Sequence, residues 1–186
     1  MITQASARWT RLDAPGEDQC RLILDGADWR LLGEARYDEG RGECRLGYDV
    51  LCDAAWHTRS ATIEGEMTGR PITIRIERQG DEWSLNAIHQ LQVTGLIDID
   101  LSFTPATNIL PIRRCTPIHG QTIETVAAWL TPDFRLAPLH QTYTREAADI
   151  WVYAATNHGF TARLRVHPTG LVINYPGLWT GEVAVG

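Results

Sequence analysis

The chain has 186 residues, 44% of them hydrophobic and 22% charged, and its formal net charge is −6. This length suits one globular domain, and we expect residues 1–186 to form a single one. The acidic balance argues against nucleic acid as a partner. No apolar run approaches the length of a membrane span, and no charged-then-apolar signal pattern begins the chain, so we expect a cytoplasmic protein.

Short alternations of apolar and polar residues, separated by turn signals, predict a mainly β protein. In chain order, strands are expected at 20–24, 29–36, 43–51, 56–66, 72–77, 83–89, 97–103, 122–130, 134–145, 150–156, 160–166 and 171–175. Turns are expected at 40–42, 79–81 and 157–159. So many strands favour one large antiparallel sheet that curls into a barrel, half-barrel or sandwich.

Three of these segments leave alternatives open. Residues 122–130 carry apolar positions at helical spacing, but their β-branched residues and the nearby Pro132 favour a strand. Residues 134–145 contain Pro138, which predicts an edge strand or two short strands. Residues 56–66 hold few large apolar side chains, so we expect a strand that faces water or a polar cavity.

The stretch 95–114 contains the most concentrated chemistry in the chain. Its first half alternates between one apolar and one polar face: Ile97, Ile99, Leu101 and Phe103 against Asp98, Asp100 and Ser102. Pro105 and Pro111 prevent the strand from continuing, and Thr104 before Pro105 is typical of a helix N-cap. A short apolar helix over 104–110 would then plug the concave side of the curled sheet.

The two aspartates of this stretch are compatible with several roles. Residues two apart on a strand face the same way, which places the Cβ atoms of Asp98 and Asp100 roughly 7 Å apart. That spacing suits an inverting glycosidase, a cation site or acceptors for sugar hydroxyls. The alternative is that both acids lie on a solvated outer face without a role. Arg113 and Arg114 either lie at the surface, lock one aspartate in a bidentate pair, or meet a phosphate.

Other candidate residues carry weaker signals. Asn108 lies between the two prolines, where bonding to turn backbone is its simplest role, and Tyr175 and Trp179 form an aromatic turn that stacks on a sugar or closes the core. The cysteines and histidines lack metal-ligand spacing, so we expect buried thiols, no metal and no cofactor. The candidate ligand-binding residues are Asp98, Asp100, Asn108, Arg113, Arg114, Tyr175 and Trp179. No catalytic residue is assigned.

The run of residues 98–114 resembles the signature of the bacterial family called Putative glycolipid-binding, formerly a domain of unknown function. Three further elements resemble that family: Ala128-Trp129-Leu130, the Gln-x-Tyr-x-Arg pattern at 141–145, and the run 172–179. The likeness covers nearly the whole chain. Departures from the family pattern occur at Leu96, Ile109 and 180–181.

This resemblance implies a many-stranded antiparallel sheet around one helix, a homodimer, and an acidic pocket for a sugar-bearing lipid, with a link to bacterial glycolipid metabolism. We therefore favour a glycolipid- or amphiphile-binding protein in which Asp98 and Asp100 line the pocket. One alternative is a hydrolase acting on a sugar or lipid head group through these two acids. The other is a non-catalytic dimeric interaction domain, since a fold likeness alone does not establish a function.

Overall fold

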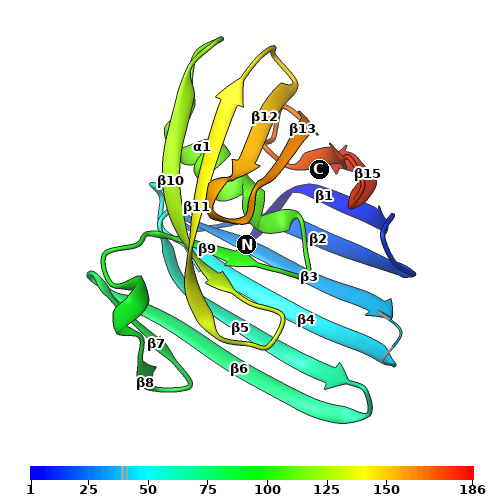
Figure 1. Cartoon of the computed structure of the whole chain (residues 1–186), viewed down its shortest axis with the longest axis vertical. Helices are drawn as coiled ribbons and strands as arrows, with labels where there is room; N and C mark the ends of the chain where they lie inside the picture. The colour runs from blue at the N-terminus through cyan, green and yellow to red at the C-terminus, as the bar shows by residue number, and fades with distance from the viewer. Residues whose placement is uncertain (39, 41) are drawn as a thin grey trace.

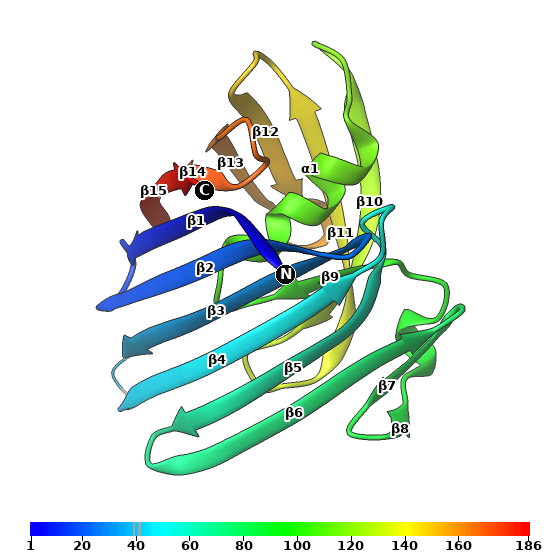
Figure 2. The same cartoon turned by 180° about the vertical axis from the view of Figure 1, so that it is seen from behind.

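The computed structural model describes residues 1–38, 40 and 42–186, which form one sheet of 15 strands. Across the sheet the strands follow the order β8-β7-β6-β5-β4-β3-β2-β1-β15-β14-β13-β12-β11-β10-β9. The sheet curls so that its first and second halves face each other with the helical segment between them (Figures 1 and 2). This confirms the predicted mainly β fold with a curled sheet around one short helix.

The first half of the chain is a run of antiparallel strands: β1 (Ile2–Arg11), β2 (Gly16–Asp25), β3 (Asp28–Asp38), β4 (Glu43–Cys52), β5 (Thr58–Met67), β6 (Arg70–Gln79), β7 (Glu82–Leu85) and β8 (Ile88–His89). The second half contains the helical elements η1 (Leu91–Val93), η2 (Ala106–Asn108), α1 (Ile109–Cys115) and η3 (Thr156–His158). Its strands are β9 (Asp98–Leu101), β10 (Thr122–Leu130), β11 (Leu136–Arg145), β12 (Ile150–Ala155), β13 (Phe160–Val166), β14 (Val172–Tyr175) and β15 (Trp179–Val185).

Alternation along each strand explains how the sheet obtains one buried face. In β2, Cys20 and Leu22 are buried while Gln19 and Arg21 are exposed, as a period of two requires. The predicted hairpin at 79–81 joins β6 to β7 through Gly80, whose φ of +59° is easily adopted only by glycine. The buried faces of both halves of the sheet contribute to one hydrophobic core.

One pair of strands departs from the predicted antiparallel pattern. β9 runs parallel to β10, with Asp98 opposite Ala127 and Leu101 opposite Leu130. A parallel pair needs a crossover of a dozen or more residues, and the segment 102–121 provides it. The other side of β9 approaches the start of β5, where Thr58 N donates to Ile97 O at 3.0 Å and Ile99 N donates to Thr58 Oγ1 at 3.1 Å. The crossover therefore places the helix between the two halves of the sheet.

The helical plug differs in detail from the prediction. Helical backbone starts at Ala106, whose N–H donates to Thr104 Oγ1 at 3.0 Å, so Thr104 provides the expected cap one residue further from the helix. The α-helix then continues through Pro111 to Cys115 rather than ending at 110. Pro111 is tolerated because the first turn of a helix has no intrahelical partners for its N–H groups. The two arginines therefore lie on the helix and not after it.

The uncertain strand assignments resolve as follows. The segment 122–130 is a strand, as favoured, but β5 buries Thr58, Ala61 and Ile63, so the prediction that it faces water or a polar cavity was wrong. β11 is one strand with neighbours on both sides, not an edge strand or two short ones. Its Pro138 fits because the pairing with β12 begins only at Gln141, which leaves the proline on an unpaired side. The sequence analysis did not predict β1 or β15.

Several other expectations can be checked against the described residues. The turn expected at 40–42 includes Arg41, which lies outside them. Cys20, Cys44 and Cys52 are buried thiols, as predicted, whereas Cys115 is only half-buried. Among the residues that the structure describes, no helix is both long enough and apolar enough to cross a membrane, and no group of three or more potential metal ligands occurs.

Candidate functional site

Asp98 forms an ion pair with Arg114 inside the protein. The Asp98 side chain is 1% exposed, and Arg114 contacts it with two nitrogens: Nη2 at Oδ2, and Nε at Oδ1 at 3.3 Å. Thr125 Oγ1 donates a further hydrogen bond to Asp98 Oδ2 at 3.0 Å. A buried carboxylate needs such partners because removing it from water is costly. The bidentate lock is one of the expected alternatives, and it fixes α1 against β9 and β10.

Asp100 points toward the same side of β9 but has a different environment. It is partly exposed, and its Oδ2 accepts a hydrogen bond from Gln141 Nε2 at 2.7 Å. The same Nε2 lies 3.1 Å from the hydroxyl of Tyr153. Burial raises the pKa of Asp100 to about 6, while the Gln141 hydrogen bond acts against this rise. No ion pair joins Asp100 to a cation among the described residues, so its carboxylate is available to another donor.

Alternate residues of β11 hold the central stretch in place. Besides Gln141, Tyr143 donates from its hydroxyl to Asn108 Oδ1 at 2.9 Å, and Arg145 Nη1 donates to Pro117 O at 3.1 Å. Asn108 is buried, and its Nδ2 donates to Pro105 O at 3.1 Å, which is the turn-bonding role expected for it. The Gln-x-Tyr-x-Arg pattern therefore has a physical basis, because its three side chains lie on one face of β11. They hydrogen-bond to β9, to η2 and to the loop at Pro117.

Aromatic side chains surround the Asp100 carboxylate. Trp129 of β10 is the cross-strand neighbour of Asp100, is partly exposed, and meets the ring of His158 edge-on at 5.1 Å between centroids. Tyr175 is buried and contacts Tyr153 and the half-buried Phe160, with centroids 5.8 and 6.0 Å away. We call Asp100, Gln141, Trp129 and His158 the acidic-aromatic cluster.

Two of the seven candidate residues lie elsewhere. Arg113 projects from α1 toward Trp56, with its guanidinium carbon 5.4 Å from that ring centroid. Trp179 is buried under Arg11, whose guanidinium carbon lies 5.7 Å from its ring. The structure thus brings together Asp98, Asp100, Asn108, Arg114 and Tyr175, but not Arg113 or Trp179.

A second buried carboxylate was missed by the sequence analysis. Asp18 is 2% exposed and accepts hydrogen bonds from Tyr48 Oη at 3.1 Å and from Thr104 Oγ1. Burial raises the pKa of Asp18 to about 7, whereas the two hydroxyl donors lower it. The sequence did hold a signal, because Asp18 falls in phase with the buried Cys20 and Leu22 of β2. This group ties β2 and β4 to the loop that leads into the helix.

The ring of Tyr48 can reach Asp18 because its strand neighbour is glycine. Gly33 lies opposite Tyr48, and a Cβ there would approach the Tyr48 ring to 2.3 Å and Gln19 O to 2.4 Å. The ring therefore lies flat over the position where another residue would carry a side chain. Any larger residue at Gly33 would displace Tyr48 from the carboxylate.

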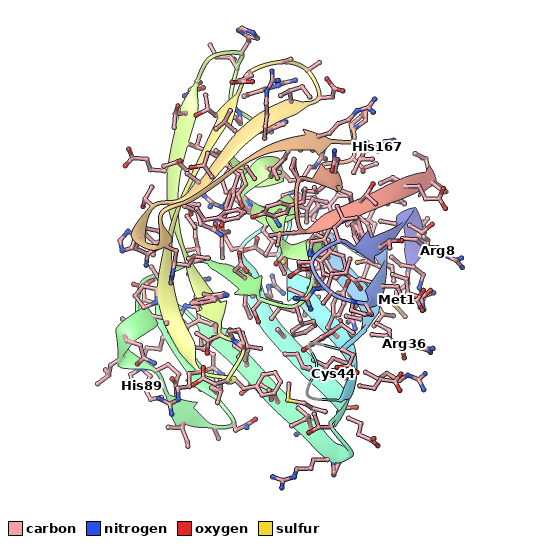
Figure 3. The ribbon with its side chains drawn as sticks, turned by 45° about the vertical axis from the view of Figure 1, so that its right-hand side comes forward. Met1, Arg8, Arg36, Cys44, His89 and His167 are labelled. Carbon is pink, nitrogen blue, oxygen red and sulfur yellow. The ribbon has the colours of Figure 1, made fainter. Side chains whose placement is uncertain are left out.

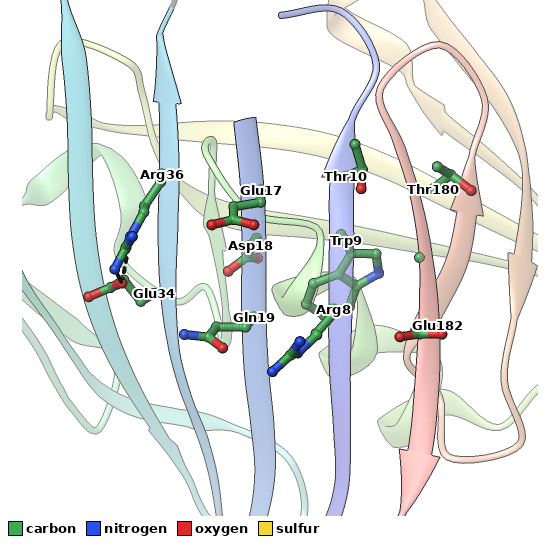
Figure 4. A pocket seen from close by; sticks show the side chains of 11 residues that line it. Arg8, Trp9, Thr10, Glu17, Asp18, Gln19, Glu34, Arg36, Thr180 and Glu182 are labelled. Carbon is green, nitrogen blue, oxygen red and sulfur yellow. Dashed lines mark hydrogen bonds and ion pairs between the residues drawn. The ribbon is translucent and has the colours of Figure 1, made fainter. Parts of the chain in front are cut away.

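One surface depression has neither Asp98 nor Asp100 in its lining, although Asp18 is among its lining residues. It measures about 630 Å³ and lies over β1, β2, β3 and β15 on the solvent-facing side of the sheet (Figure 4). Its side chains are mainly exposed and charged, and Glu34 and Arg36 pair with each other at 2.8 Å. Figure 3 shows Arg8 and Arg36 extending away from the sheet. Such a surface offers hydrogen bonds but little apolar area for a lipid.

A smaller, more apolar crevice opens at the end of β9. It measures about 150 Å³ and is lined by residues from both halves of the sheet, including Tyr37, Met67, Phe103 and Phe134. Phe103 follows Asp100 by three residues in the sequence, so the crevice begins just beyond the strand that carries Asp100. A space of this size holds about one benzene-sized group.

The comparisons with known proteins agree with this fold. A crystal structure of a DUF1089 family protein from Pseudomonas aeruginosa shares 31% sequence identity, with a TM-score of 0.77 and coverage of 88% of this chain and 91% of that one. A beta-barrel-like protein of DUF1849 from Brucella abortus is similar in fold alone, with 9% identity, a TM-score of 0.57 and coverage of 99% and 97%. No curated protein matches the chain. Residues 6–181 match the family model described as "Putative glycolipid-binding", and the chain therefore belongs to that family.

Proposed function

We propose that this protein binds a sugar-bearing amphiphile of the glycolipid class, with the sugar at the acidic-aromatic cluster. The observation that carries the proposal is the Asp100 carboxylate, which is partly exposed, held by Gln141 and not paired with a cation among the described residues. Carboxylates and amides are strong partners for sugar hydroxyls, and Trp129 offers an aromatic face beside them. Family membership supports the same class of ligand.

The apolar part of the ligand would lie toward the crevice at the end of β9. Its lining of Tyr37, Met67, Phe103 and Phe134 suits the first groups of an acyl chain. The crevice is too small for a whole acyl chain, so the rest of the chain would stay near the surface or in a membrane. We therefore place recognition in the head group and the adjoining apolar segment.

Binding fits the geometry better than hydrolysis by the two aspartates. An acid–base pair needs both carboxyl groups within reach of substrate or water. Asp98 is 1% exposed, and both its oxygens are engaged by Arg114 and Thr125. Only Asp100 retains an oxygen without a hydrogen bond to a described residue. The homodimer and the link to glycolipid metabolism implied by the resemblance, and the cytoplasmic location, stay predictions.

A titration with n-octyl β-D-glucoside, kept below its micelle concentration, tests the proposal. We expect wild-type protein to bind it, and Asp100→Asn to weaken binding about tenfold, because one charge-assisted hydrogen bond contributes roughly 1.5 kcal/mol or more. Trp129→Leu should weaken binding by a similar factor. Because the ionised carboxylate is the acceptor, affinity should rise as pH passes upward through about 6, the raised pKa of Asp100.

Asp149→Asn is the matched control, since the Asp149 carboxylate is exposed, pairs with Arg165 at 3.2 Å and is not part of the acidic-aromatic cluster. It should leave the affinity unchanged. Equal affinity of wild type and Asp100→Asn, or no binding of the glucoside by either, would count against a sugar site at Asp100. Isothermal titration calorimetry gives the affinity in each case.

A further inference from the structure

The tandem arginines of α1 have different partners. Arg114 engages Asp98, but Arg113 makes no hydrogen bond or ion pair with any residue that the structure describes. Its Nε is buried without an acceptor. A buried donor of this kind calls for a partner such as a water molecule or an ion. Arg113 is therefore a cation whose hydrogen-bonding capacity is still available.

The position of Arg113 is fixed by packing. Its guanidinium lies over Trp56, which in turn stacks on Trp29 with centroids 4.7 Å apart and planes inclined by 17°. Its aliphatic stem approaches Gly170, where a Cβ would come within 2.8 Å of Arg113 Cδ and 2.9 Å of its Cγ. Gly170 also has a φ of +95°, so this close approach depends on glycine. Arg113 is thus packed against a glycine turn at its stem and against a tryptophan ring at its guanidinium.

The loop that presents Trp56 is held in an unusual conformation. Trp56 has a φ of +67°, which is rare for a residue with a bulky side chain. Asp53 stabilises the loop, because its Oδ1 accepts the backbone N–H groups of Ala55 and His57, each at 2.9 Å. Asp53 Oδ2 lies 3.3 Å from His57 Nδ1, so this carboxylate is directed at its own loop and not at Arg113. Backbone strain of this kind is typical of ligand-binding positions.

We propose that Arg113, positioned between Trp56 and Gly170, binds an oxyanionic group of the phosphate or carboxylate class. A guanidinium presents parallel N–H donors that match two oxygens of such a group, and it is weakly hydrated when stacked on an aromatic ring. No carboxylate of the described residues pairs with Arg113, so an incoming anion meets no internal competitor. The contacts of Arg113 with Trp56 and Gly170 do not involve Asp100, so this proposal does not require the sugar site to exist.

Titration with two probes tests the proposal: inorganic phosphate, and dihexanoylphosphatidic acid below its micelle concentration. Tryptophan fluorescence reports binding, since Trp56 lies against the guanidinium. We expect wild-type protein to bind at least the phosphatidic acid, Arg113→Gln to bind at least tenfold more weakly, and Arg113→Lys to fall between them because it keeps charge but loses the fork. Arg163→Gln, at an exposed arginine paired with Glu146, is the matched control and should bind like wild type.

The two probes distinguish the source of the anion. Comparable affinity for both indicates a site for the free anion, whereas binding of the phosphatidic acid alone indicates a lipid head group. In wild-type protein, an NMR shift of the Arg113 Nε–H on adding the probe provides a test that does not depend on the folding of a variant. Equal binding by wild type and Arg113→Gln, or no binding and no Nε–H shift with either probe, would overturn the proposal. Asp100→Asn should not change phosphate binding, so failure of the sugar site is recognised separately.

Discussion

Replacing Arg114 by methionine is expected to lower the free energy of unfolding by about 3–5 kcal/mol. The change keeps the aliphatic stem but leaves the Asp98 carboxylate, 1% exposed, with only the hydroxyl of Thr125 as a side-chain donor. The cost arises because a buried charge without its partner is far less stable than the same charge in water. Urea denaturation at pH 7 measures the change from the shift in midpoint.

The matched control for this experiment is Arg163→Met. Arg163 forms an ion pair with Glu146 at 2.7 Å, but its side chain is 68% exposed. Exposed pairs of this kind contribute only about 0–1 kcal/mol. If Arg114→Met costs no more than Arg163→Met, the Asp98–Arg114 pair does not hold α1 against β9 and β10. The double variant Asp98→Leu/Arg114→Met should recover much of the lost stability, since it removes the buried charge together with its partner.

Replacing Asp18 by asparagine is expected to change how stability depends on pH. The pKa of Asp18 is raised from 3.8 to about 7, so the folded state retains a proton that the unfolded state releases. This contribution to stability is therefore complete below about pH 4 and is lost as pH rises through about 7. Relative to wild type, Asp18→Asn should gain roughly 4 kcal/mol between pH 4 and pH 8. Denaturation midpoints measured across this pH range give the difference.

Tyr48→Phe provides a directional check on the same group. It keeps the ring over Gly33 but removes a hydroxyl that donates to Asp18 at 3.1 Å and lowers its pKa. The pKa of Asp18 should rise further, so the loss of stability should begin at the same pH but continue to a higher pH in this variant. If Asp18→Asn and wild type lose stability in parallel between pH 4 and pH 8, the Asp18 carboxyl does not titrate in the way described.

The alternation of apolar and polar residues predicted most of the strands, but it predicted little of how the strands pair with one another. Alternation identified β4, β6 and β13, because one face of each strand is apolar. It failed for β1, where the buried face consists mainly of Ala5 and Ala7, and for β15, which contains Gly181. Small residues suit these positions since large rings lie over them: Trp9 covers Gly181, where a Cβ would approach the ring to 2.3 Å. Such packing between strands distant in sequence leaves no periodic signal.

The two aspartates of the site were predicted from the sequence, but most of the residues that hydrogen-bond to them were not. Two aspartates on one strand predicted a polar face. The different environments of Asp98 and Asp100 depend on Arg114 and Gln141, which are 16 and 41 residues from their respective partners. Gln141 and Asp18 share one detectable feature, since each is a polar residue at an inward-facing position of an alternating strand. A search for polar residues in the buried phase would have found both. The parallel pairing of β9 with β10 depends on the crossover helix, and no strand pattern encodes it.

The most direct test of the central claim uses the indole N–H signals of the seven tryptophans. In a nitrogen-15 NMR spectrum, Trp129→Phe assigns one signal, and n-octyl β-D-glucoside is then added to wild-type protein. We expect the Trp129 indole and the Gln141 side-chain amide to shift together, and octyl dimethylamine oxide, which lacks the sugar, not to reproduce the amide shift. Shifts confined to other residues, or no shift at Trp129 and Gln141 at saturating glucoside, would contradict a sugar-binding site beside Asp100.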